Sequence, residues 1–321
     1  MWVRPPPGAP SRRHAALDVC SAADRGHDDV VDADGVACAA QALELLKREA
    51  YYSNRVDWAT VAEQVLSDAH AGTPLVQAIR PALAALGDRH SHLRPANWTA
   101  TLHRQHNESP HGGYLGQGVA YLCLPAISIA DPRSLDSVNY ARAAFGVLET
   151  YRSAHAWIVD LRGNTGGSVH PMLAAVGPLL GAVTFLSYQR RAGGGARFTY
   201  QPGRLLNNGT PTLDLPTVPQ DSSGLPVAVV HDGRTASAGE GVAVAFSGRQ
   251  RTRTFGSATA GVPTGNVLRR LPDGSMLAVT VSVAVDRKGR RYTSALFPEE
   301  PSDQTLTDPI HQARSWLTTA E

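Results

Sequence analysis

The chain has 321 residues and a formal net charge of +2 at pH 7, and 42% of its residues are hydrophobic and 18% charged. These values are typical of a globular protein with one large domain or two smaller ones. The small net charge gives no indication of nucleic acid as a partner, and no run approaches the ~20 apolar residues that a membrane span needs. Ala, Gly and Arg are abundant and Lys is scarce, which is typical of a GC-rich bacterial genome.

Residues 1–35 are rich in Pro, Asp, Ala and Arg without sustained periodicity, and we expect them to form a disordered tail. The first residues contain no apolar signal segment, which favours a cytoplasmic protein. A misassigned start codon would hide such a segment, in which case the protein is secreted.

Residues 36–95 have the pattern of a small helical subdomain. The composition predicts a first helix over 36–50, and the spacing predicts a second helix that begins after Asp57 as its N-cap. A third helix is expected over 74–86, with Gly87 ending it.

Residues 96–321 have the alternating pattern of an α/β catalytic core. Apolar strand-like runs and helical segments follow one another, which predicts crossovers covering a largely parallel sheet. The expected strands are 119–127, 156–161 and 225–230, and the expected helices are 134–151, 171–180 and 241–246. Residues 184–222 are polar and rich in Gly, Pro, Ser and Thr, and we expect an irregular insertion with one hairpin there.

The segment Thr235-Ala-Ser-Ala-Gly-Glu240 places Ser237 between an expected strand and an expected helix. A serine on such a tight turn exposes its hydroxyl and aims backbone N–H groups at a reacting carbonyl, so Ser237 is a candidate nucleophile and Ala238 a candidate oxyanion donor. The alternative is a serine that only caps the helix.

Asp160-Leu-Arg-Gly-Asn-Thr-Gly-Gly167 follows the second expected strand. Gly166 or Gly167 could let the backbone approach a substrate and donate to an oxyanion, or the segment could be a simple turn. The pair His90 and His92 does not share a helix face, and no other group has metal-ligand spacing, so we expect no metal site. The alternative for either residue is an ordinary surface histidine.

These segments resemble motifs of the tail-specific (C-terminal processing) protease family, both in their residues and in their order along the chain. Its members carry D-x-R-x-N-x-G-G after a strand and x-A-S-A-(S/G)-E further along, and residues 255–261 partly match a third segment. The resemblance covers residues 36–302. It implies a spiral β-β-α core similar to crotonase-like and Clp-type folds behind a helical N-terminal subdomain, a serine hydrolase mechanism, and no cofactor.

The chain departs from the Ser–Lys members of that family. Val262 stands where they have the lysine, and the only lysines are Lys47 and Lys288. Asp88-Arg-His-Ser-His-Leu93 matches the D-x-H-(S/T)-x-L motif of the branch that resembles the tricorn core protease and the retinoid-binding-protein-like modules. In that branch a histidine is the base, which implies His90.

The acid of the triad is implied less directly. Glu240 belongs to the family's serine motif and is the first expectation, with Glu299 and Glu300 as alternatives.

The segment between Leu93 and Gly118 is too short for the PDZ domain that tail-specific proteases insert there. We therefore expect a PDZ-less serine peptidase that forms an acyl-enzyme on a peptide or protein substrate and selects it through the pocket and residues 184–222. The alternatives are a non-catalytic module of the same fold that binds a hydrophobic ligand, and an esterase. The sequence leaves the oligomeric state open.

Overall fold

The computed structural model describes residues 33–96, 108–129, 131–216, 218–302 and 308–319. Of the tail expected over residues 1–35, residues 1–32 lie outside these ranges. Its last three residues belong to the first helix, which begins at Ala33. No described helix is both long and apolar enough to cross a bilayer.

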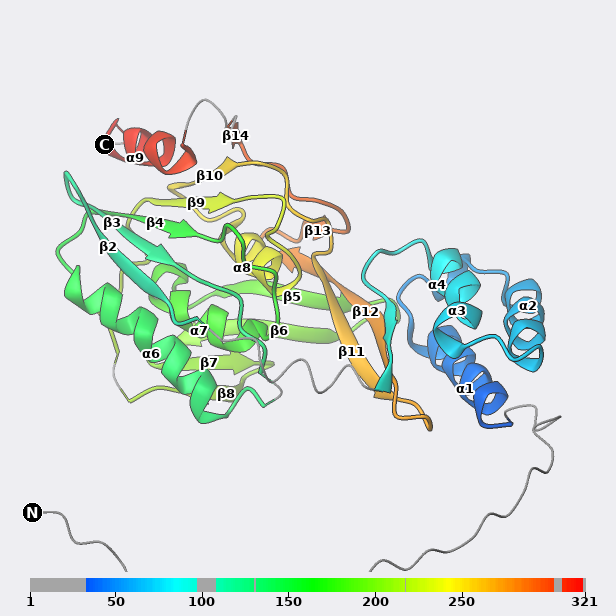
Figure 1. The fold of residues 1–321 in the computed structure, drawn as a ribbon. Coiled ribbons are helices and arrows are strands. Elements are labelled where there is room, and N and C mark those ends of the chain that lie inside the picture. The colour runs from blue at the N-terminus through cyan, green and yellow to red at the C-terminus, as the bar shows by residue number, and fades with distance from the viewer. Residues whose placement is uncertain (1–32, 97–107, 130, 217, 303–307, 320–321) are drawn as a thin grey trace, which may run out of the picture. The chain divides into compact units, whose positions relative to one another are not determined.

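The first part of the chain is helical, as its periodicity indicated (Figure 1). Its elements are α1 (Ala33–Glu49), a 3-10 turn (Ser53–Arg55), α2 (Trp58–His70), α3 (Leu75–Ala78) and α4 (Arg80–Leu86). Asp57 caps α2 by accepting hydrogen bonds from two backbone N–H groups, and Gly87 ends α4 in the left-handed conformation. The helix expected over 74–86 is divided at Ile79, because Pro81 has no N–H to continue the ladder and fits only the first turn of a new helix.

The core contains a six-stranded sheet with the order β14-β10-β9-β4-β3-β2. Every neighbouring pair in it is parallel except β2 with β3. The strands are β2 (His111–Gly116), β3 (Val119–Cys123), β4 (Ala156–Asp160), β9 (Val227–His231), β10 (Thr252–Gly256) and β14 (Glu300–Pro301). The expected mixed α/β class with a largely parallel sheet is confirmed.

Helices cover both faces of this sheet because successive strand residues point to opposite sides. On one face pack α6 (Leu135–Thr150), α7 (Val169–Leu180) and α8 (Ala238–Phe246). On the other packs α9 (Pro309–Thr319), whose Ala313 and Leu317 contact Ile158 and Val230. Ser134 caps α6 by accepting from Ser137 N–H.

The segment 184–222 was expected to be irregular, and that expectation is wrong. It contains β5 (Thr184–Arg190), β6 (Gly195–Gln201), β7 (Arg204–Asn207) and β8 (Thr210–Asp214), each antiparallel to the next. Several of the Gly and Pro residues that suggested a loop lie in the turns between strands, while alternate side chains such as Phe198 and Tyr200 are buried against α7. Gly177 of α7 provides the room, because a side chain there would overlap the Tyr200 ring.

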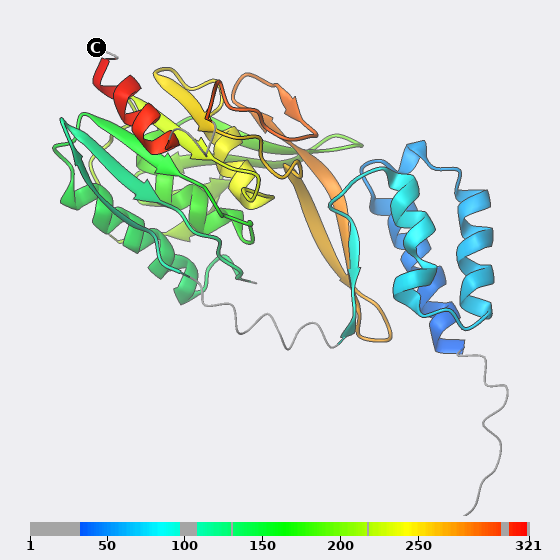
Figure 2. The ribbon, with the colours of Figure 1, turned by 45° about the horizontal axis from the view of Figure 1, so that its top comes forward.

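A second sheet joins this meander to the helical part of the chain. Its long strand β12 (Met276–Asp286) pairs with β1 (His92–Arg94), β5, β11 (Thr264–Arg270) and β13 (Arg291–Tyr292). Leu277 and Val279 of β12 pack with helices α1, α2 and α4 in one hydrophobic cluster. Figure 2 shows these helices beside the hairpin of β11 and β12. The strand β12 therefore connects the loop that carries His90 with the core.

Candidate active site

Two of the sequence motifs meet because they follow neighbouring parallel strands. Asp160 ends β4 and is paired in register with Val230 near the end of β9. The carboxyl ends of parallel strands lie at one edge of a sheet, so the turns after β4 and β9 are brought together there. Asp232 fixes the second turn, since its Oδ1 accepts the N–H groups of Gly163 and Thr235.

Ser237 stands at the N-terminus of α8 in an unusual backbone conformation. Its φ is 50° and its ψ is −112°, a region that residues with a side chain rarely adopt. The turn is confined from the opposite side by Gly166, where a Cβ would lie 2.9 Å from Ser237 Cβ and 2.8 Å from the carbonyl oxygen of Ala236. The strained turn therefore depends on a glycine in the other motif.

Asn164 joins the two motifs from a fully buried position. Its Nδ2 donates to the Leu124 carbonyl, its Oδ1 accepts Gly166 N–H, and its backbone oxygen accepts Ala236 N–H, at 2.8–2.9 Å. Gly239 allows the approach, because a Cβ there would lie 2.8 Å from Asn164 O. This explains why one motif needs an asparagine and the other a glycine.

The expectation that Gly166 donates to an oxyanion is wrong, because its N–H is already donated to Asn164 Oδ1. No hydrogen bond between described residues uses the N–H groups of Gly167 and Ala238. A Cβ at Gly166 would lie 3.1 Å from Ala238 N, so Gly166 adjoins the start of α8. Gly167, with φ of 113°, lies against the Ile127 carbonyl, which a Cβ would approach to 2.0 Å.

The loop between α4 and β1 holds His90 by its backbone. Asp88 Oδ1 accepts the N–H groups of His90 and Ser91, at 2.9 and 2.6 Å, and the hydroxyl of Thr280. Asn266 Nδ2 donates to the His90 carbonyl at 2.9 Å. The pattern of Asp88, His90 and Ser91 in the sequence thus forms a capped turn that is hydrogen-bonded to β11 and β12.

The ring of His90 is oriented by Thr264. The distance from His90 Nδ1 to Thr264 Oγ1 is 2.6 Å, and Thr264 is buried. Burial lowers the pKa of His90 to about 4, with smaller effects of the same sign from His92 and Arg94 and an opposing one from Asp88. The imidazole is therefore neutral at pH 7 and can accept a proton.

His92 lies beside His90 but both of its ring nitrogens have partners. Its Nδ1 lies 2.8 Å from the His90 carbonyl, and its Nε2 accepts the Arg94 Nε–H at 2.7 Å. This arrangement fixes its tautomer, with the proton on Nδ1. His92 supports the backbone of His90 and has no free nitrogen for proton transfer.

Glu240 does not orient His90, contrary to the first expectation. Its fully buried carboxylate accepts hydrogen bonds from the Thr259 hydroxyl at 2.5 Å and from the N–H groups of Ser237, Gly261 and Val262 at 2.9 Å. Burial raises its pKa, and these hydrogen bonds oppose the increase. Through these hydrogen bonds, the carboxylate connects the turn that carries Ser237 to the segment that precedes β11.

The two alternative acids do not orient His90 either. Glu299 accepts Thr254 N–H, and Glu300 forms an ion pair with Arg253. The partner of the His90 ring was missed because Thr264 is 174 residues away in sequence and carries no catalytic signature. The sequence of β11, whose first residue is the buried Thr264, does not alternate and gives no signal for this role.

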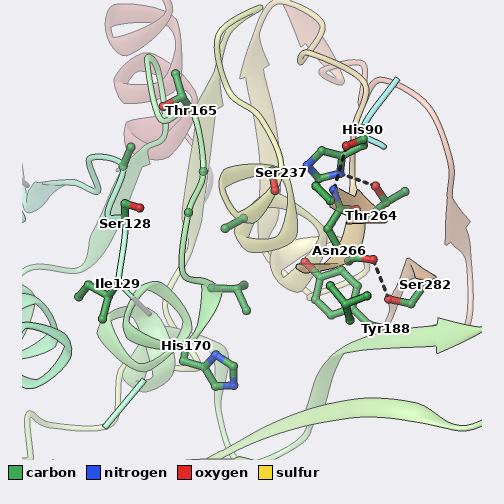
Figure 3. A pocket seen from close by; sticks show the side chains of 18 of the residues that line it. His90, Ser128, Ile129, Thr165, His170, Tyr188, Ser237, Thr264, Asn266 and Ser282 are labelled. Carbon is green, nitrogen blue, oxygen red and sulfur yellow. Dashed lines mark hydrogen bonds between the residues drawn. The ribbon is translucent and has the colours of Figure 1, made fainter. Parts of the chain in front are cut away.

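Ser237 and His90 line one cavity of about 1390 Å³. Figure 3 shows Ser237 at the cavity with the His90 ring beside Thr264, and both described lysines are absent from its lining. The charged side chains that line it are Arg94, Glu108, Arg162, Arg190 and Arg234. Within the described ranges, no three His, Cys, Asp or Glu residues form a cluster suited to a metal ion.

The chain is similar in sequence to a known protein family and to a curated protein. A model of Peptidase family S41 matches residues 118–297. The "Nisin-resistance protein" of Lactococcus lactis subsp. lactis is 30% identical over 184 residues, which are 57% of this chain and 55% of that protein. The chain thus spans about half the length of this curated relative.

Solved structures share the fold. The structure of a lipoprotein from Streptococcus agalactiae matches 90% of this chain and 97% of its own, with a TM-score of 0.76 and 22% identity. The photosystem II D1 C-terminal processing protease matches 87% of this chain and 96% of its own, with a TM-score of 0.57 and 14% identity.

Proposed function

Because the chain belongs to peptidase family S41, we propose that it is a serine peptidase with Ser237 as nucleophile and His90 as general base. The family membership confirms the resemblance to tail-specific proteases that the order of motifs indicated. The substrate is a peptide or protein, and the reaction passes through an acyl-enzyme on Ser237.

The proposed mechanism gives a role to the Ser237 hydroxyl, the His90 ring, the Thr264 hydroxyl and two backbone N–H groups. Ser237 Oγ attacks the carbonyl carbon of the substrate while the free Nε2 of His90 takes the hydroxyl proton, and later gives it to the leaving amine. We assign Thr264 Oγ1 as the acceptor of the Nδ1–H, because the general base needs its Nε2 unprotonated. We assign the N–H groups of Ala238 and Gly167 as the oxyanion donors, because neither donates to a described acceptor.

The observation that carries this proposal is the shared cavity of Ser237 and His90, in which a neutral, oriented imidazole and a strained serine turn face the same space. Hydrolysis of internally quenched peptides by the wild type, Ser237→Ala and His90→Ala tests it. We expect both substitutions to reduce kcat/KM by at least about 10³-fold. Full activity in either variant would rule out the assigned role.

A non-catalytic ligand-binding module is not favoured. Such a module would have no need for a base whose ring is fixed at 2.6 Å from a hydroxyl, or for a serine with φ of 50°. Esterase activity uses the same groups, so a matched ester and amide pair distinguishes a peptidase from an enzyme that is restricted to esters.

Two finer assignments extend the proposal. The alternation of sheet, helices α7 and α8, and second sheet supports a crotonase-like spiral core. The name of the Lactococcus relative makes nisin the first compound to test as a substrate, by mass spectrometry of the products after incubation with wild type and Ser237→Ala.

A further inference from the structure

Three aromatic side chains form a group on the wall of the cavity that the proposed mechanism does not use. The rings of His170 and Tyr188 each contact Phe198 edge-to-face, with centroids 5.2 and 6.4 Å away and interplanar angles of 81° and 90°. Phe198 is 2% exposed, so it forms a buried base under the other two rings. We call His170, Tyr188 and Phe198 the aromatic group.

The aromatic group adjoins the nucleophile through two elements. His170 lies three residues after the oxyanion candidate Gly167, in the first turn of α7. The Tyr188 hydroxyl lies against the first turn of α8, where a Cβ on Gly241 would meet it at 2.5 Å, and Gly241 N–H donates to the Ser237 carbonyl. In Figure 3, His170 and Tyr188 both border the cavity that contains Ser237.

The chemistry of this wall is apolar and uncharged. Ile129 and Val169 complete it and, with Tyr188, pack against the main hydrophobic core. Burial lowers the pKa of His170 and raises that of Tyr188, so both side chains are neutral at pH 7. Among the charged residues that line the cavity, Arg190 is the nearest to Tyr188 in sequence, two residues away, and it is exposed.

We propose that the aromatic group, with Ile129 and Val169, is the specificity pocket for the substrate residue whose carbonyl is attacked, and that it takes an uncharged apolar side chain, with aromatic rings preferred. The inference rests on the proposed function, because it needs Ser237 to define the attacked carbonyl. Edge-to-face positions beside His170 and Tyr188 favour a third ring. A charged side chain would lose its hydration among these uncharged rings.

The test is a set of quenched peptides that differ only at the residue before the cleaved bond, which is Phe, Leu, Ala, Lys or Glu. We expect kcat/KM for Phe and Leu to exceed that for Lys and Glu by at least about tenfold. In His170→Glu the ratio of Lys to Phe should increase by at least about tenfold, because the pocket gains a counter-ion. The matched control is His70→Glu, which places the same change on an exposed part of α2.

A second variant keeps the proposal testable where His170→Glu does not fold. His170→Trp fills the pocket and should shift the preference from Phe toward Ala. Equal rates for all five peptides, or an unchanged order in folded His170 variants, would overturn the inference. Fluorophosphonate labelling of Ser237 is the separate readout: a labelled enzyme without preference refutes only the pocket, whereas a wild type without labelling refutes the proposed function itself.

Discussion

His90 Nδ1 lies 2.6 Å from Thr264 Oγ1, so the residue that orients the proposed base is a hydroxyl and not a carboxylate. A carboxylate in this position would stabilise the imidazolium that forms when His90 takes a proton. A hydroxyl orients the ring but adds no negative charge. The consequences of this pairing can be measured.

Thr264→Val should lower kcat by about 10- to 100-fold, because the valine has a similar shape but cannot accept the Nδ1–H of His90. KM should change little, since the substitution does not alter the substrate contacts of the nucleophile. Thr264→Ser restores the hydroxyl and should recover most of the activity. Equal kcat in wild type and Thr264→Val would show that the contact does not position the base.

The acid limb of the pH profile should reflect the lowered pKa of His90. The proposed base is active when neutral, and its pKa of about 4 keeps it neutral down to about pH 5. We therefore expect kcat/KM to remain nearly constant from pH 7 to pH 5 and to fall around pH 4, where His90 becomes protonated. Short assays with circular dichroism at each pH separate this titration from unfolding. An inflection near 6.5, the usual pKa of a histidine, would contradict the assignment.

Glu240→Gln should reduce both stability and activity. Its carboxylate accepts four hydrogen bonds, and an amide must turn its NH₂ toward groups that already donate. We expect a loss of about 1–3 kcal/mol in the free energy of unfolding, measured in urea, together with a lower kcat. The control is Glu299→Gln at an exposed position, which should change stability by less than about 0.5 kcal/mol. Equal stability of the two variants would show that the hydrogen bonds of Glu240 do not stabilise the serine turn.

Gly167→Ala should inactivate the enzyme by displacing the proposed oxyanion donor. A Cβ there would lie 2.0 Å from the Ile127 carbonyl oxygen, and the φ of 113° is unfavourable for alanine. The loss should appear mainly in kcat, by about 10²-fold or more. The control is Gly146→Ala on the exposed side of α6, where nothing lies within 4 Å of the added Cβ. It should leave activity intact and stabilise the protein by about 1 kcal/mol.

Local patterns in the sequence predicted the parts of the fold that depend on local physics. Asp57 caps α2 and Gly87 ends α4 as predicted, and the helix expected over 134–151 forms behind Ser134, which is its N-cap. The strands on which the motifs depend were recognised because they are short apolar runs followed by glycine-rich turns. Residues 184–222 were misjudged because their polar and turn-forming residues outnumber the buried side chains between them.

Contacts between distant segments account for the errors at the site. Thr264 reaches His90 only because β12 pairs with both β1 and β11, a register that no local pattern encodes. Gly166 and Gly167 looked equivalent in the sequence, and Asn164 distinguishes them by accepting the N–H of the first. Glu240 had the residue type of a catalytic acid, but its surroundings supply four donors and no histidine.

The most direct test of Ser237 as the nucleophile is covalent labelling with a fluorophosphonate. The adduct is detected by mass spectrometry of the intact protein and located by peptide mapping. We expect one adduct per chain, on Ser237, and no adduct in Ser237→Ala. We also expect slower labelling in His90→Ala, since the base that activates the hydroxyl is missing. An adduct on another residue, or labelling of Ser237→Ala at the wild-type rate, would contradict the assignment of Ser237 as the nucleophile.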